Sequence, residues 1–237
     1  MLSMRRTIAL LLFALSCTFV LTPHAQQQPT AEPGSLPEQS SPAQTGPRRP
    51  TSTPYTGDLS VFEDPNRDRL LQVNRVMDTL RLHPGSVIAD IGAGGGWFSV
   101  RAARRVAPNG RVYAEDINPH AVETIRDRAT REHLPDITTI LGTPDDPKLP
   151  PNSLNAALML RVYHEVANPP RLLANLRSAL KPGGVFAVID HPGNGSDHGI
   201  NADVVKSEVT HAGYRYLAQY DFTKGDQNDY MLLFERP

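Results

Sequence analysis

The chain has 237 residues, of which 39% are hydrophobic and 21% charged, and its formal net charge is -1. This length suits one domain of ordinary size with extensions, and the composition is typical of a soluble globular protein rather than a polytopic membrane protein. No long basic run is present, so nucleic acid is not expected as a partner. The single cysteine, Cys17, lies in an N-terminal apolar stretch, which excludes disulfides, thiolate metal sites and cysteine nucleophiles from the rest of the chain.

Residues 1–25 have the pattern of a secretion signal. Two arginines precede an apolar run at 8–15, and Ala25 stands where a cleavage site is expected. Two alternatives stay open, namely a lipoprotein signal ending at Cys17 and an uncleaved anchor. We therefore expect an exported, periplasmic or membrane-anchored protein, with membrane association only through this segment. A cytoplasmic protein stays open as well.

Residues 26–57 have the composition of a linker. The segment holds seven prolines, with Gln, Ser and Thr between them, and it lacks apolar periodicity. Such a sequence cannot bury enough apolar surface to offset its chain entropy. We expect a disordered or extended spacer, followed by one folded domain at 58–237.

Within that domain, segments with helical spacing alternate with short apolar runs. Helices are predicted at 64–82, 97–106, 119–133, 169–180 and 202–212. Strands are predicted at 87–91, 111–116, 137–141, 154–160, 185–190, 214–222 and 230–235. The alternation predicts an α/β fold with a Rossmann-like, doubly wound, seven-stranded sheet. Because the last two strands follow each other through a short connection, we expect a hairpin whose final strand runs antiparallel.

The first predicted strand ends in a glycine-rich turn, residues 90–96, which contains four glycines. Ligands of open α/β sheets bind beyond the carboxyl ends of the strands. A dinucleotide-binding turn requires a small residue where this chain has Trp97, because that residue packs the helix onto the strand. Asp90, inside the strand end, disfavours a pyrophosphate and favours a cationic group. The turn therefore predicts a ligand that carries positive charge.

The run Val87-Ile88-Ala89-Asp90-Ile91-Gly92-Ala93-Gly94 resembles motif I of class I S-adenosylmethionine (SAM) dependent methyltransferases. Asp116, at the end of the second strand, and the Leu-Lys-Pro-Gly-Gly turn at 180–184 match further features of that family, so the resemblance covers residues 85–237. It implies SAM as the cofactor. The cofactor-binding residues that it implies are Asp90, Gly92, Ala93, Gly94, Asp116, Ile117, Thr143 and Arg161.

Asp90 and Asp116 match the family's pattern, whereas Thr143 departs from it. Asp90 holds the amino-acid part of SAM by this resemblance, and Asp116 accepts both ribose hydroxyls. Glu115 is one residue away and is expected to face the other side of the strand. Thr143 stands where the family usually has an acid that contacts adenine, so the adenine contact is not specified by this sequence.

The methyl acceptor is expected beside the ends of the fourth and fifth strands. His164 is the candidate catalytic residue, as a general base, because the pKa of histidine is close to neutral pH. The alternative is a packing or capping role. Asp190 and His191 form a second candidate pair. No metal site is predicted, because the fourth strand ends in Leu160-Arg161 without a carboxylate.

These observations predict a SAM-dependent methyltransferase that acts on an unknown, small acceptor. A non-catalytic module with the same fold, at the cell envelope, is the alternative that the export signal motivates, because SAM is made in the cytoplasm. An NAD(P)-dependent oxidoreductase is a weaker alternative, which Trp97 and Asp90 oppose.

Overall fold

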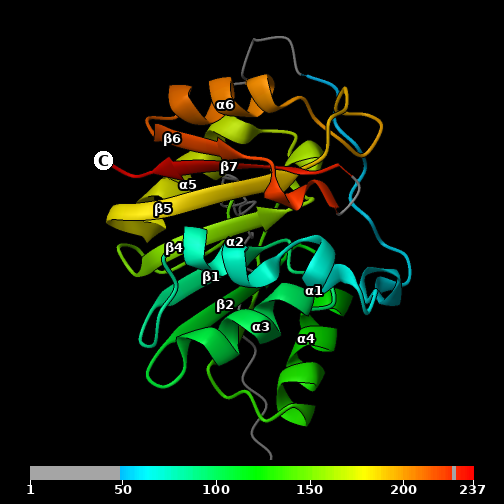
Figure 1. Cartoon of the computed structure of the whole chain (residues 1–237), viewed down its shortest axis with the longest axis vertical. Helices are drawn as coiled ribbons and strands as arrows, with labels where there is room; N and C mark the ends of the chain where they lie inside the picture. Colours follow the sequence, from blue (N-terminus) through cyan, green and yellow to red (C-terminus); the bar gives the residue numbers. More distant parts are fainter. Residues whose placement is uncertain (1–48, 226–227) are drawn as a thin grey trace, which may run out of the picture. The chain divides into compact units, whose positions relative to one another are not determined.

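The computed structural model of the chain describes residues 49–225 and 228–237 (Figure 1). The predicted secretion signal and Cys17 lie outside the described residues, as does most of the predicted linker. Within the described part, no helix has both the length and the apolar character that a membrane crossing requires.

The described residues contain one sheet of seven strands, in the order β3-β2-β1-β4-β5-β7-β6. The strands are β1 (Val87–Ile91), β2 (Arg111–Asp116), β3 (Ile137–Leu141), β4 (Leu154–Leu160), β5 (Leu180–Asp190), β6 (Arg215–Tyr220) and β7 (Tyr230–Glu235). β1 to β5 pair in parallel, whereas β7 is antiparallel to both β5 and β6. The predicted fold class, including the antiparallel last strand, is confirmed. The strand order reverses between β1 and β4, which is the position where such sheets bind ligands.

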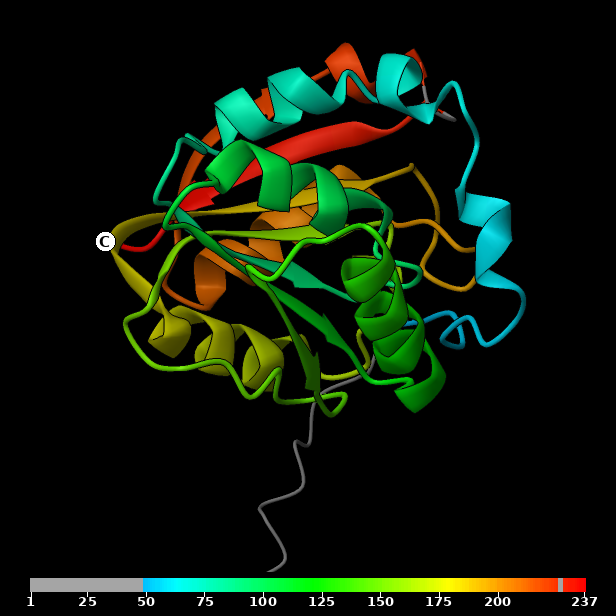
Figure 2. The same ribbon diagram turned by 90° about the horizontal axis from the view of Figure 1, so that it is seen from below.

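Helices cover both faces of this sheet (Figure 2). The helices of the described residues are η1 (Leu59–Phe62), α1 (Arg67–Leu70), α2 (Val73–Thr79), α3 (Trp97–Val106), α4 (Pro119–Arg131), η2 (Tyr163–Glu165), α5 (Pro169–Ala179), α6 (Ala202–His211) and η3 (Phe222–Gly225), where η marks a 3-10 helix. α2 and α3 pack on one face, and α5 and α6 pack on the other. Two apolar cores result, one on each side of the central strands.

Two predicted elements differ most from the structure, whereas α4, α5, α6 and β6 differ from their predicted bounds by one or two residues at an end. The helix expected at 64–82 is divided into α1 and α2, because Gln72 adopts a left-handed conformation with φ 53°. The Gln72 side-chain amide donates a hydrogen bond of 2.8 Å to the carbonyl oxygen of Phe222, so a contact with η3 accompanies the break. β5 begins at Leu180, so the turn expected before it belongs to an irregular first part of the strand.

The segment 49–57, which the sequence assigns to the linker, contacts the folded domain. Arg49 forms an ion pair of 2.9 Å with Glu208 of α6. Ser52 is buried, and its backbone N–H donates to the carbonyl oxygen of His164. In Figure 1 this segment passes the ends of the parallel strands before it reaches α1. The folded domain therefore begins earlier than the predicted boundary at residue 58.

Candidate functional site

The carboxyl ends of β1, β2 and β4 open into a cavity of about 420 Å³. Its lining includes every residue for which the sequence predicts cofactor binding: Asp90, Gly92, Ala93, Gly94, Asp116, Ile117, Thr143 and Arg161. The structure thus brings together residues that lie up to 71 positions apart in the chain. Their individual roles stay predictions.

The glycine turn forms one wall of the cavity through close backbone approach. Gly92 has φ +68°, and a Cβ placed on it would lie 2.6 Å from Cγ2 of Val162. Only glycine meets both conditions without displacement of a neighbour. The N–H of Ala93 donates to the carbonyl oxygen of Glu115 over 2.8 Å, which ties the turn to β2.

Two acids stand beside this turn with their oxygens held by local hydrogen bonds. Asp90 is buried and accepts a hydrogen bond of 2.6 Å from the Ser99 hydroxyl. Burial raises the pKa of Asp90 to about 6, and the negative charge of Asp116 adds to the rise. Asp116 accepts from the N–H groups of Gly94 and Asn118 at 2.9 and 2.8 Å. Both carboxylates are therefore positioned before any ligand arrives.

Glu115 lines the same cavity as Asp116, although adjacent residues of a strand point to opposite faces. The space for its side chain comes from Gly142, just after β3, where any Cβ would overlap the Glu115 carboxylate. Burial, with the charge of Asp116 as the next cause, raises the pKa of Glu115 to about 8. The cavity extends around the end of β2, so both neighbours in the sequence reach it.

Arg67 and Glu165 also line the cavity, and neither is among the predicted site residues. The guanidinium carbon of Arg67 lies 4.5 Å from the ring centroid of Trp97. Arg67 precedes Leu70 and Leu71 by three and four residues, so it falls on the apolar stripe of the predicted helix. A buried cation on an apolar stripe is the signal that identifies it. Burial raises the pKa of Glu165 to about 7, and no comparable sequence signal marks this acid.

The N-terminal segment supplies an apolar wall. Tyr55, Leu59 and Phe62 line the cavity, and the Tyr55 and Phe62 rings meet edge to face at 5.3 Å. The backbone N–H of Tyr55 donates to Oε1 of Glu165 over 3.2 Å. This wall is adjacent to η2, whose residues follow β4.

His164, the predicted general base, does not line the cavity. Its side chain is buried, and Nδ1 lies 2.9 Å from Oδ1 of the fully buried Asp190. Asp190 thus pairs with His164, whereas Nδ1 of His191 is 3.8 Å from the same oxygen. His164 and Asp190, which the sequence offers as separate candidates, therefore form one Asp-His pair. Glu165, which lines the cavity, approaches Nε2 of His164 at 3.9 Å.

Arg161 and Thr143 line the cavity in constrained loops. Nε of Arg161 donates to the buried Asp229 over 2.9 Å, and Arg161 itself has φ +57°. Thr143 and Asp146 exchange backbone hydrogen bonds of 2.9 and 3.1 Å, which closes a tight turn after β3. Such backbone conformations are often kept at functional sites.

Residues 89–188 match the family model described as "Methyltransferase domain". The chain is 33% identical over 108 residues to a demethylmenaquinone methyltransferase of Symbiobacterium thermophilum, a match that covers 45% of this chain and 43% of the relative. It is also 33% identical over 108 residues to a 2-phytyl-1,4-naphtoquinone methyltransferase of Trichormus variabilis, covering 45% and 47% of the two chains. The chain thus spans less than half the length of these curated relatives.

The fold is similar to that of a SAM dependent methyltransferase from Aquifex aeolicus, with a TM-score of 0.69 and 21% sequence identity. That similarity covers 77% of this chain and 100% of the other. The residues that match the family model contain the glycine turn, Asp116 and η2.

Proposed function

We propose that this chain, whose residues 89–188 form a class I methyltransferase domain, transfers a methyl group from SAM to a small, largely apolar acceptor. One observation carries the proposal: the glycine turn opens into a cavity that also holds Arg67 and the carboxyl groups of Asp90, Glu115 and Asp116. A buried excess of carboxyl groups is costly unless a cation enters the site. SAM has two cationic groups, a sulfonium and an ammonium, which would pair with these carboxyl groups. Its carboxylate would pair with a cation of the cavity lining, Arg67.

Each polar part of SAM has a complementary group in this cavity. Asp90 would accept from the ammonium, and Arg67, which faces the same region, would hold the carboxylate. Asp116 would accept from the ribose hydroxyls with lone pairs that its two backbone hydrogen bonds leave open. Glu115 lines the same site, and a bound cation would favour its ionised form. The Trp97 ring stacks against Arg67 and limits its motion.

The apolar wall defines the class of acceptor. Tyr55, Phe62, Val166 and Leu172 line the cavity along with the polar groups, and a flat apolar ring would bury surface against them. The two curated relatives are named for demethylmenaquinone and for a phytyl naphthoquinone. A hydroxylated naphthoquinone-type ring is therefore the first acceptor class to test.

Methyl transfer is an in-line displacement, so the enzyme contributes mainly orientation of the acceptor atom, the methyl carbon and the sulfur. The cavity orients SAM by the contacts above, and the η2 side chains stand beside the apolar wall. His164 as a general base stays a hypothesis, since Glu165 lines the cavity and His164, whose Nε2 is 3.9 Å from Oε1 of Glu165, does not.

Calorimetry with S-adenosylhomocysteine, the product of SAM, tests the cofactor part of the proposal. The full chain is expected to bind this ligand with micromolar affinity. Asp116→Asn should weaken binding about 10- to 100-fold, because hydrogen bonds to a charged acceptor contribute about 1.5–3 kcal/mol. Asp127→Asn, on the exposed face of α4, is the matched control and should leave the affinity unchanged.

Turnover with radiolabelled SAM and a panel of naphthohydroquinones and simple phenols tests the reaction. Label in an extracted small molecule supports methyl transfer. Tight cofactor binding without turnover on any acceptor class would favour the non-catalytic module instead. Binding of NAD(P) in place of the SAM product would favour the oxidoreductase.

Export of the chain is part of the proposal and is supported by the pattern of residues 1–25 alone. A reporter enzyme that is active only outside the cytoplasm, fused after Pro237, tests it. Activity that disappears when residues 1–25 are deleted supports export, and an inactive fusion of the full chain contradicts it.

A further inference from the structure

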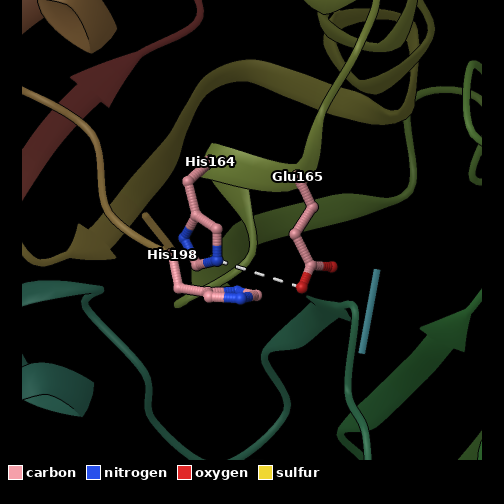
Figure 3. A group of neighbouring side chains, drawn as sticks. All are labelled: His164, Glu165 and His198. Atoms are coloured by element: carbon pink, nitrogen blue, oxygen red, sulfur yellow. Dashed lines mark ion pairs between the residues drawn. The ribbon is translucent and has the colours of Figure 1, made fainter. Parts of the chain in front are cut away.

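Three potential metal ligands lie close together, and one of them, Glu165, lines the cavity (Figure 3). His164 and Glu165 belong to η2, and His198 belongs to the loop between β5 and α6. One ligand atom from each residue can be chosen such that all three lie within 4.8 Å of one another. Figure 3 shows the His164 ring and the Glu165 carboxylate pointing toward the His198 ring.

His164 has the support that metal-binding histidines usually have. Its Nδ1 lies 2.9 and 3.0 Å from the two carboxylate oxygens of Asp190, which is fully buried. A carboxylate on one ring nitrogen fixes the tautomer and directs the other nitrogen toward the ion. Within the described residues, Nε2 of His164 makes no hydrogen bond and approaches Oε1 of Glu165 at 3.9 Å.

His198 is held in place by its backbone. It has φ +59°, a conformation that non-glycine residues rarely adopt. Its N–H donates to the Ser52 hydroxyl over 2.9 Å, and that hydroxyl donates to the carbonyl oxygen of Gly195. The N–H of Ser52 also donates to the carbonyl oxygen of His164. One buried serine therefore ties together the two segments that carry the candidate ligands.

The side chains require only small adjustments to bind an ion. Zn–N and Zn–O bonds of about 2.0–2.1 Å place tetrahedral ligand atoms roughly 3.3–3.5 Å apart. The separation of 3.9 Å between His164 and Glu165 is close to that value. The His198 ring is exposed and meets the His164 ring edge to face at 5.9 Å, so rotation of its side chain can close the remaining distance.

We propose that His164, Glu165 and His198 bind a divalent transition metal ion, with Zn²⁺ as the best match, at the edge of the cofactor cavity. Two histidines and one glutamate form a ligand set that leaves a fourth position open for water or substrate. Asp190 is the positioning residue behind His164. The sequence spacing predicts no such site, because His198 lies 33 residues after Glu165.

The open position gives the ion a role that rests on the proposed methyl transfer. An acceptor hydroxyl bound there loses its proton to solvent more readily, as metal-bound water does. The oxygen then forms a bond to the methyl carbon, the S–CH₃ bond breaks, and its electron pair returns to sulfur. In this arrangement His164 is a ligand rather than a general base.

Zn²⁺ titration of metal-stripped, untagged full-length protein, against a chromophoric chelator, tests the site. We expect one ion per chain at micromolar affinity or tighter. Glu165→Gln and His198→Asn should each weaken binding at least tenfold, and Asn tolerates the left-handed backbone at 198. Asp190→Asn should weaken binding about 10- to 100-fold. His211→Asn, at the exposed end of α6, is the matched control.

Co²⁺ added in place of Zn²⁺ should give the intense visible absorption of a four-coordinate ion, and His198→Asn should remove it. Absence of stoichiometric Zn²⁺ binding, or binding that neither ligand variant weakens, would overturn the proposal. Calorimetry with S-adenosylhomocysteine on the same metal-free protein separates the two hypotheses. Cofactor binding without Zn²⁺ binding removes only the metal site, whereas Zn²⁺ binding without cofactor binding removes the proposed enzyme function.

Discussion

The guanidinium carbon of Arg67 lies 4.5 Å from the centroid of the Trp97 ring, which joins α1 to the first residue of α3. A second arginine, Arg101, lies over the same ring at 4.2 Å. Arg67 lines the cofactor cavity and Arg101 does not. The two arginines share a stacking partner but differ in access to the ligand, so they form a natural pair for comparison.

Arg67→Met is expected to weaken binding of S-adenosylhomocysteine about tenfold or more, because a charge-assisted hydrogen bond to the ligand carboxylate is lost. Methylthioadenosine, which lacks the amino-acid part, should bind both proteins equally. Arg101→Met removes a similar stacking contact and should leave both affinities unchanged. Calorimetry measures the affinity of each variant for the two ligands. If Arg67→Met weakens the binding of both ligands equally, Arg67 has a purely structural role.

Local sequence periodicity predicts most of the elements because these are determined by short-range patterns. α3 and the strands β1 to β4 have the predicted bounds, and the hairpin of β6 and β7 follows from its short connection. The division at Gln72 was not predictable, since the side chain of that residue contacts Phe222 across the fold. Asn155, near the start of β4, accepts from the N–H of Val87 at the start of β1, far from the strand ends that form the cavity.

The site residues that belong to a strand end or to the turn after it were predictable from the sequence. Those that reach the site through contacts between distant segments were not. The turn with Asp90 and the acid Asp116 can be located from the sequence, because strand ends meet at one edge of a parallel sheet. That Glu115 also reaches the cavity was not predictable, since the room for its side chain comes from Gly142, which follows β3. Ser52 contacts residues more than 100 positions away, which no local pattern specifies.

Gly92→Ala is expected to lower the free energy of unfolding by about 2–4 kcal/mol, because left-handed strain and overlap with Val162 combine. Gly94→Ala is the matched control: its φ is +54°, but its nearest neighbour would be a Leu59 carbon at 4.0 Å. That variant should lose only about 1 kcal/mol from strain. Urea unfolding measures both values.

Val162→Ala tests the steric part of this loss. In a double-mutant cycle, Val162→Ala should recover part of the stability lost in Gly92→Ala, and it should recover none in Gly94→Ala. Equal losses for the two glycine variants, with no coupling to Val162, would show that backbone strain alone determines the requirement for glycine.

The buried carboxyl groups predict that stability without ligand falls as pH rises. Burial raises the pKa of Asp90 to about 6, of Glu165 to about 7 and of Glu115 to about 8. Unfolded carboxyl groups titrate near ~4, so between pH ~4 and ~8 the folded state binds more protons than the unfolded state. The free energy of unfolding therefore decreases with pH across that window.

Urea unfolding at several pH values between about 5 and 8 measures this slope. Glu115→Gln removes one of the three groups and should make the slope shallower, mainly at its upper end. Glu123→Gln, on the exposed face of α4, should leave it unchanged. A free energy of unfolding that rises with pH in this range would contradict the raised pKa values.

Ser52→Ala is expected to destabilise the domain, although Ser52 lies in a segment with the composition of a linker. The variant leaves the N–H of His198 and the carbonyl oxygen of Gly195 without the hydroxyl that each contacts. Buried groups that lose a partner cost about 1–3 kcal/mol. Thr53→Ala, at the exposed neighbouring position, is the control and should change stability by less than about 0.5 kcal/mol.

Two truncations extend the same test to the whole segment. A chain that begins at residue 46 keeps the contacts of Arg49 with Glu208 and of Ser52 with Gly195, whereas one that begins at residue 58 loses them together with Tyr55, which lines the cavity. The shorter chain should unfold at lower urea concentration and bind S-adenosylhomocysteine more weakly. If the two chains have equal stability and affinity, the contacts of residues 49–57 contribute nothing measurable. These residues would then belong to the linker, as the sequence predicts.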